Sequence, residues 1–349
     1  MESRGFSYCT SLAGVPKLRQ FDSADLTFMA HYITIPIDAN GVIDPDEQID
    51  DIIPKAMSDR FGTQDIFIYS HGWWTSADAA LKEYNVATTD FIFSIKGNVA
   101  KMTTPPLNPF LIGIHWPSML DDDPNALLDK AEVLSFYTME RRADDIGEEG
   151  LYAILRLLIA ATPANKPVRF NLFGHSFGCK VVCAALEKLA ENGIALPANV
   201  GLNVILLQAA FSTDGLDSGN EYGQVLPTFG PRLRLLISHS AKDDAVGKAF
   251  PLAHTINFFS KGAKTGLGAT GPTAATAGAF ANSQSLSVAW GSSFVGTVAS
   301  ASAQSTLISA DLTPIHSDPR NTFNGGASGH HCDIFLPEIY DLMSWFLFA

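Results

Sequence analysis

Two patterns of apolar residues alternate along this chain. Short runs of consecutive apolar residues predict strands that are buried on both faces, whereas apolar residues that recur every three or four positions predict helices. The runs of strand length occupy 65–70, 111–115, 168–173, 203–210, 232–240 and 306–310. Helical spacing is clearest over 141–161, where Leu151, Ile154, Leu155 and Leu158 share one face, and over 179–190. Strands that alternate with helices predict an α/β fold with a mainly parallel central sheet.

Two further elements complete this prediction. Residues 25–37 form an early strand that we expect to pair antiparallel near a sheet edge, where its proline is tolerated. Residues 77–96 have the pattern of a helix. The chain has 349 residues, of which 46% are hydrophobic, so it is long enough to bury a large core. We expect a single domain over 1–349 rather than two independent ones.

Residues 261–305 interrupt the alternation. Lys261 and Lys264 are the only charged residues in the wider stretch 261–310, which is dominated by Gly, Ala, Ser and Thr. This composition is too apolar for a solvated linker and too rich in small residues for a packed core. We predict an insertion over about 261–305 that folds as a flap near the site, with Phe280, Trp290 and Phe294 as apolar contacts. An insertion far from the site is the alternative.

The net charge of the chain limits the classes of partner that it can bind. Lys and Arg total 23 against 36 Asp and Glu, a formal net charge of −13, which argues against nucleic acid and anionic membrane surfaces as partners. The first residues do not resemble a signal peptide, and no run is long enough to span a membrane, so we expect a cytoplasmic protein. Four cysteines do not make a disulfide framework. Cys179 and Cys183 share one helix face and are expected to pack in the core.

The most informative motif is Gly174-His175-Ser176-Phe177-Gly178, which lies between a predicted strand and a predicted helix. This context is that of a nucleophile elbow, a tight turn that holds a serine hydroxyl where a histidine can take its proton. Glycines on both sides allow the backbone to crowd together at such a turn. Ser176 is therefore the candidate nucleophile.

An acid and a base follow in the order that this architecture requires. The strand 232–240 runs into a polar loop in which Asp243 is the favoured acid, with Asp244 as the alternative. Near the C-terminus, His331 is the favoured base because Asp333, two residues later, could cap the final helix; His330 is the alternative. A zinc site at these histidines is disfavoured, because the ligands are too close in sequence and no second pair lies nearby.

The remaining part of such a site is an oxyanion hole made of backbone N–H groups. The strand 65–70 ends in His71-Gly72-Trp73-Trp74, so we expect the N–H groups of Trp73 and Phe177 to be the donors. Trp74, His71 and His175 are expected on the substrate side of the site. We expect His71 to brace the loop rather than to act as the base. We expect Trp73 and Trp74 to form the wall of an acyl or aromatic pocket.

Together, His71-Gly72, Trp116-Pro117-Ser118, the elbow around Ser176, Asp243 and His331 resemble the α/β-hydrolase superfamily, most closely over 65–190. Trp73-Trp74 replaces the Phe or Tyr followed by Asn that is common in these relatives. The resemblance implies a serine hydrolase, without a cofactor or metal, that acts on a small-molecule ester with an apolar acyl or aromatic group. Amide or thioester cleavage by the same triad, and a non-catalytic homologue that only binds a ligand, are the alternatives. The oligomeric state is left open.

Overall fold

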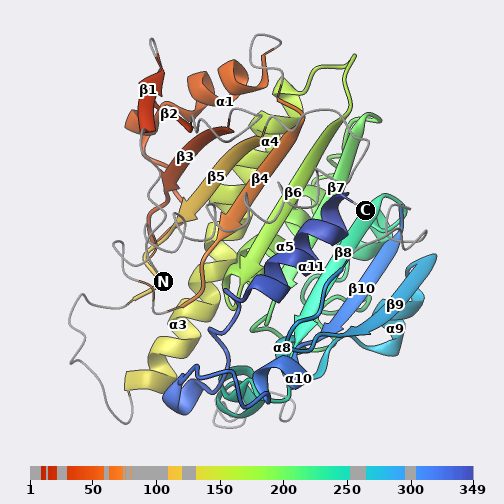
Figure 1. Cartoon of the computed structure of the whole chain (residues 1–349). Helices are drawn as coiled ribbons and strands as arrows, with labels where there is room; N and C mark the ends of the chain where they lie inside the picture. The colour runs from red at the N-terminus through yellow and green to blue at the C-terminus, as the bar shows by residue number, and fades with distance from the viewer. Residues whose placement is uncertain are drawn as a thin grey trace.

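The computed structural model describes residues 9–12, 15–21, 30–58, 63–73, 75, 80, 109–119, 131–251, 265–294 and 304–348. Within them, ten strands form one sheet in the order β1-β2-β3-β5-β4-β6-β7-β8-β10-β9 (Figure 1). The strands are β1 (Cys9–Leu12), β2 (Val15–Phe21), β3 (Ala30–Pro36), β4 (Asp65–Ser70), β5 (Pro109–His115), β6 (Val168–His175), β7 (Val200–Leu207), β8 (Leu233–His239), β9 (Asn282–Ser287) and β10 (Thr306–Asp311).

Eight of these strands, from β3 to β9 in the sheet order, are parallel to one another. β1 and β2 extend the sheet in antiparallel pairing. Each apolar run predicted to be a strand is one, and the α/β architecture with a mainly parallel sheet is confirmed. The strand predicted over 25–37 is β3, which pairs antiparallel with β2, as expected, and parallel with β5 on its other side.

The helices are η1 (Pro45–Glu47), α1 (Ile49–Met57), α3 (Ala131–Asp145), η2 (Ile146–Leu151), α4 (Tyr152–Ala161), α5 (Gly178–Glu191), α6 (Val225–Phe229), η3 (Ala245–Ala249), α8 (Leu267–Thr270), α9 (Ala274–Gly278), α10 (Thr313–His316), η4 (Gly326–Ser328) and α11 (Pro337–Phe348). The predicted helix 141–161 comprises the end of α3, a π-helical turn (η2) and α4, and its predicted core residues, three leucines and one isoleucine, are buried. Of the predicted helix 77–96, all but Ala80 lies outside the described residues.

Both faces of the sheet are covered, because alternate side chains of each central strand enter different cores. In β4, Ile66 and Ile68 pack with α1, α4 and α5, whereas Phe67 packs on the opposite face with α11. Figure 1 shows α11 lying across one face of the central strands and α3 to α5 behind the other. Cys179 and Cys183 of α5 are buried in the first core, as predicted. Among the described residues, no helix has both the length and the apolar character needed to cross a membrane.

The insertion differs from its predicted form. Its described part, 265–294, is folded: it contains α8 and α9 and supplies the edge strand β9, which pairs with β10. Phe280 is buried in the core, and Trp290 and Phe294 pack against the α11 side of the sheet. The backbone hydrogen bonds and aromatic side chains of these residues therefore belong to the body of the domain, and Phe280, Trp290 and Phe294 make the apolar contacts predicted for them. Residues 252–264 and 295–303 lie outside the described residues.

Helix α11 is held to the sheet at its C-terminal end by arginines. Arg234 on β8 donates to the carbonyl oxygens of Phe346 and Leu347, and its guanidinium stacks 4.7 Å from the centre of the Phe346 ring. Carbonyl groups in the last turn of a helix receive no hydrogen bond from an N–H group of the same helix, so a cation beside them is stabilising. Arg169 on β6 lies over the ring of Phe348 while it binds Asp65 with two hydrogen bonds.

On the opposite face, α5 carries a fully buried lysine. The ammonium of Lys180 forms an ion pair with Glu221, lies 3.3 Å from Asp144, and is 5.3 Å from the centre of the Tyr222 ring. Tyr222 in turn donates to Asp144 over 2.7 Å. Burial raises the pKa of Asp144 to about 6 despite the lysine, and the surrounding carboxylates raise the pKa of Lys180. This cluster joins α5 to α3 and to the segment before α6.

Replacing Lys180 with Met should therefore leave Asp144 and Glu221 facing each other without a cation. We expect the free energy of unfolding at pH 8 to fall by about 3–5 kcal/mol, the usual cost of breaking a buried ion pair. The loss should be smaller at pH 5, where Asp144 takes up a proton. Urea unfolding at both pH values measures this. Lys188→Met, in the last turn of the same helix, is the control and should cost below about 1 kcal/mol; an equal loss in both variants would contradict the assignment.

Candidate active site

Ser176 occupies a strained turn between β6 and α5. Its φ is +57°, a left-handed conformation that non-glycine residues rarely adopt. The flanking glycines make the turn possible: a Cβ on Gly178 would lie 2.1 Å from the carbonyl oxygen of Ser70, and one on Gly174 would lie 2.5 Å from the Cys179 nitrogen. The turn thus has the backbone geometry predicted for a nucleophile elbow, at the C-terminal edge of the parallel strands.

The loop after β4 lies directly against this turn. A Cβ on Gly72 would lie 2.8 Å from the Ser176 Cβ and 3.2 Å from the His175 carbonyl oxygen, so no side chain larger than that of glycine fits between the loop and the turn. His71 is fully buried: its Nδ1 donates to the Gly72 carbonyl oxygen over 2.8 Å, and its Nε2 accepts from the Trp116 N–H over 3.3 Å. Its ring also stacks on Trp116 with 5.3 Å between the ring centres. The structure thus places His71 where it braces the loop, inside the protein.

The favoured acid and base are hydrogen-bonded to each other. His331 Nδ1 lies 2.8 Å from Asp243 Oδ2, and both side chains are buried. Their loops are joined by an isolated bridge between Asp243 and Gly329 and by the hydrogen bond from the His330 N–H to the Lys242 carbonyl oxygen. The Val246 N–H donates to the other carboxylate oxygen of Asp243. The alternative acid, Asp244, is partly exposed and pairs instead with Lys248.

The loop 329–333, which carries the candidate base His331 and is called the base loop below, also touches the elbow. His175 Nε2 donates to the carbonyl oxygen of His331 over 3.0 Å, and the two imidazole rings lie 5.0 Å apart between centres. Burial lowers the pKa of His175 to about 3, so this ring is neutral and bonds through one nitrogen. Among the described residues, no hydrogen bond joins the Ser176 hydroxyl to His331. Bonds of this kind are often long before a substrate binds.

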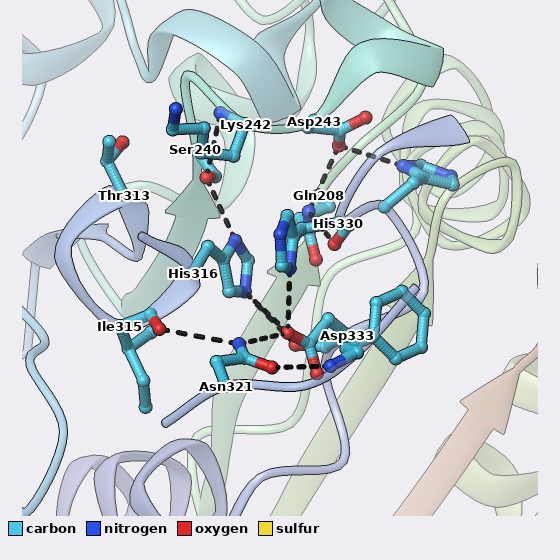
Figure 2. Close-up of polar contacts among 12 residues, drawn as sticks. Gln208, Ser240, Lys242, Asp243, Thr313, Ile315, His316, Asn321, His330 and Asp333 are labelled. Atoms are coloured by element: carbon cyan, nitrogen blue, oxygen red, sulfur yellow. Dashed lines mark hydrogen bonds and ion pairs between the residues drawn. The ribbon is translucent and has the colours of Figure 1, made fainter. Parts of the chain in front are cut away.

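The alternative base, His330, belongs to a second network (Figure 2). Its Nδ1 bonds to Asp333 Oδ2 over 3.0 Å, and Asn321 donates to the same carboxylate oxygen. His316 lies between the Ser240 hydroxyl and the Asp333 carbonyl oxygen, and stacks on the ring of His330. The predicted capping role of Asp333 is wrong, because α11 begins only at Pro337 and the carboxylate is bound by His330 and Asn321. Asp333 instead holds the base loop to α10 and its following segment.

Aromatic residues from four segments meet beside the elbow. Phe136 of α3 lies 5.2 Å from Phe177, 6.0 Å from Trp73 and 5.8 Å from Phe250, measured between ring centres. Phe177 is the residue before α5, where helix N–H groups have no acceptor within the helix. Trp73 follows the glycine that touches Ser176. The two predicted oxyanion donors therefore lie on the two backbones that meet at the serine, whereas Trp74 lies outside the described residues.

One polar residue at the centre of the site was not predicted. Gln208, directly after β7, donates to both Asp243 and the His330 carbonyl oxygen. His316 and Asn321 were also missed. The only signal for Gln208 was its polar character within the apolar run 203–210, where an amide needs partners if it is buried.

The site thus combines a serine on a strained turn, an imidazole bonded to a buried carboxylate, and N–H groups at a helix start, a set of parts suited to acyl transfer. No family model matches this chain, and no curated protein matches it.

Adding one methyl group at Gly178 should separate the elbow from β4. We expect Gly178→Ala to lower the free energy of unfolding by at least about 2–3 kcal/mol, because the new Cβ meets backbone atoms rather than a side chain that could move. Thermal unfolding of the purified variant measures the loss. Gly278→Ala, in α9, is the control, since nothing lies within 4 Å of its Cβ position. A Gly178→Ala protein as stable as this control would contradict the contact.

Buried neutral histidines should make the protein sensitive to acid. Burial lowers the pKa of His71 from 6.5 to about 3, so the unfolded chain binds a proton that the folded chain does not. The stability contributed by its neutral form is complete above pH 6.5 and is lost as the pH falls toward 3, by about 1.4 kcal/mol per pH unit. Urea unfolding of His71→Gln between pH 7 and 4 should show a shallower decline than the unchanged protein. Parallel curves would contradict the assignment.

Proposed function

We propose that this chain is a serine hydrolase of the α/β-hydrolase type that cleaves carboxylic esters through an acyl-enzyme intermediate. The observation that carries the proposal is the hydrogen bond from His331 to the buried Asp243, beside the left-handed turn at Ser176. A buried imidazole–carboxylate pair next to a serine on a strained turn is the arrangement that serine acyl transfer requires.

In this mechanism Asp243 orients the base. Because Nδ1 of His331 carries the proton shared with Asp243, Nε2 holds a lone pair and removes the Ser176 hydroxyl proton as the oxygen attacks the ester carbonyl carbon. Nε2 then gives this proton to the leaving alcohol. A water molecule repeats the sequence on the acyl-serine and releases the carboxylic acid. The neighbouring His175 is neutral and already bonded to the base loop, so it does not compete for the proton.

The N–H groups of Trp73 and Phe177 would stabilise the oxyanion that forms on the ester carbonyl. Gly72 supports this assignment, because it brings the first of these segments against Ser176 with no side chain between them. Donors that are already oriented need no rearrangement as the charge develops, which is why such groups contribute strongly to catalysis.

The aromatic residues around the elbow favour an apolar or aromatic acyl group. Trp73, Phe136, Phe177 and Phe250 lie within 6.0 Å of one another in successive pairs, and Trp73 is only partly buried. An acyl chain that packs on such rings is removed from water, which contributes about 0.8 kcal/mol for each buried methylene group.

Removing the Ser176 hydroxyl should abolish hydrolysis. We expect Ser176→Ala to lower kcat on p-nitrophenyl acyl esters by about 10⁴- to 10⁶-fold, because the members of a triad act as a unit, while the fold is retained. The measurement is release of p-nitrophenol across a series of chain lengths, together with covalent labelling by a fluorophosphonate. The neighbouring aspartates provide a matched control: Asp243→Asn should lose about 10⁴-fold in kcat, whereas Asp244→Asn should stay within about twofold.

Three outcomes separate the competing functions. Hydrolysis of esters that survives Ser176→Ala would refute the mechanism. A protein that hydrolyses matched amides faster than esters would be an amidase that uses the same residues. A protein that takes no fluorophosphonate label and cleaves neither substrate would be a binding protein without this activity.

A further inference from the structure

Gln208 occupies the point where the segments of the site converge. It directly follows β7, and its side chain is fully buried. Its Nε2 donates to Asp243 Oδ2 over 3.1 Å and to the His330 carbonyl oxygen over 3.0 Å (Figure 2). The first contact is with the same carboxylate oxygen that binds His331. One amide group therefore joins the acid to the loop that carries the base.

The residues on each side of Gln208 bind the backbone of the elbow. The Leu207 carbonyl oxygen accepts from the Ser176 N–H over 3.1 Å, and the Ala210 N–H donates to the Ser176 carbonyl oxygen over 3.2 Å. Gln208 itself is bound to β8, because its N–H donates to the Ser238 hydroxyl. A displacement of Gln208 would thus change the positions of Ser176, Asp243 and His331 together.

The conformation of Gln208 is costly and is held in place by its surroundings. Its φ is +45°, which places a glutamine in the left-handed region. The backbone of α8 packs against it so closely that a Cβ on Gly268 would lie 2.3 Å from the Gln208 carbonyl carbon. Such strain persists only where the surrounding structure over-determines it, and it is concentrated at functional sites.

The orientation of the amide follows from its partners. Both groups that it faces, a carboxylate and a carbonyl oxygen, are acceptors, so only the NH₂ group can point toward them. This orientation leaves Oε1 buried and without a hydrogen-bond partner among the described residues. A buried oxygen without a hydrogen bond is unfavourable. The two hydrogen bonds that the amide donates therefore outweigh the cost of leaving Oε1 without a partner.

We propose that Gln208 is a positioning residue that holds the Asp243 carboxylate and the His331 loop in one geometry. The inference rests on the proposed function, since it assigns Gln208 a part in that reaction. One of its N–H groups donates to Asp243 and stabilises negative charge there, and the other donates to the His330 carbonyl oxygen, so the amide fixes the separation between this carboxylate and residue 330. These contacts fix the orientation of the His331 imidazole. The end of β7 also holds the backbone of Ser176, through the hydrogen bond to the Leu207 carbonyl oxygen.

The test compares three variants. Gln208→Met keeps the length of the side chain without its donors, and Gln208→Glu keeps the shape but, at a pH where its carboxyl group is ionised, is only an acceptor. Asn203→Val is the control, because Asn203 is a buried amide in β7, the strand that precedes Gln208, and is bonded to Asn171 away from the site. For each protein, kcat and KM on a p-nitrophenyl ester are measured. The low-field proton resonance of the His331–Asp243 hydrogen bond is recorded by NMR, and Tm is determined.

We expect Gln208→Met and Gln208→Glu to lower kcat by about 10- to 100-fold with KM within about twofold, as for the loss of a hydrogen bond to a charged acceptor. The low-field resonance should shift or disappear in both. Asn203→Val should lower Tm while kcat and the resonance stay unchanged. If Gln208→Glu matches the unchanged protein in kcat and resonance, or if Gln208→Met behaves like Asn203→Val, Gln208 only fills space and the inference is overturned.

Failure of the proposed function would look different. In that case the unchanged protein would neither cleave esters nor take a fluorophosphonate label, but the resonance would still report whether Gln208 holds Asp243 and His331 together. If Gln208→Met does not fold, Gln208→Glu, which keeps the volume of the side chain, provides the comparison at a pH where its carboxyl group is ionised.

Discussion

The contact between the end of β4 and the start of α5 is the constraint on which the rest of the structure depends. At Gly178 the two backbones are so close that even a methyl group would overlap the Ser70 carbonyl oxygen. Because β6 lies directly between β4 and β7 in parallel register, the chain can leave β6 only through a sharp turn at that point. The turn determines where Ser176 lies, and it brings the loop 71–73 against it. Each later component of the site is placed relative to this contact.

The molecule stabilises the two sides of α5 in opposite ways. On the side of α3, a charged lysine is buried among carboxylates and the ring of Tyr222. On the side of the site, two buried histidines are held neutral: burial lowers the pKa of both His71 and His175 to about 3. A neutral imidazole can accept at one nitrogen and donate at the other, so it braces a loop without a counter-ion. His71 and His175 thus brace the segments around Ser176 without adding charge there.

Much of the fold could be predicted from the sequence, because the parallel strands are continuous apolar runs and the helices repeat every three or four residues. The elbow was also predictable, since glycine is required at two positions of one short motif. The pairing of His331, rather than His330, with Asp243 could not be predicted from the sequence as firmly, because it depends on a bridge between loops far apart in the chain. Asp333 was misjudged for a related reason: its partners, Asn321 and His330, lie in an irregular segment without periodicity. Gln208 and the edge strand β9 were missed because a single polar residue in an apolar run and a Ser-rich stretch carry no local signal of their tertiary partners.

The base loop has one further property that separates it from the sheet. Residues 329–333 are attached by an isolated bridge, by side-chain hydrogen bonds and by a few backbone bonds, rather than by a ladder of strand pairing. Segments of this kind open locally at a lower free energy than the core that carries them. The persistence of the imidazole–carboxylate pair is therefore governed by the local opening equilibrium of five residues, and a change that leaves global stability untouched could still dismantle that pair.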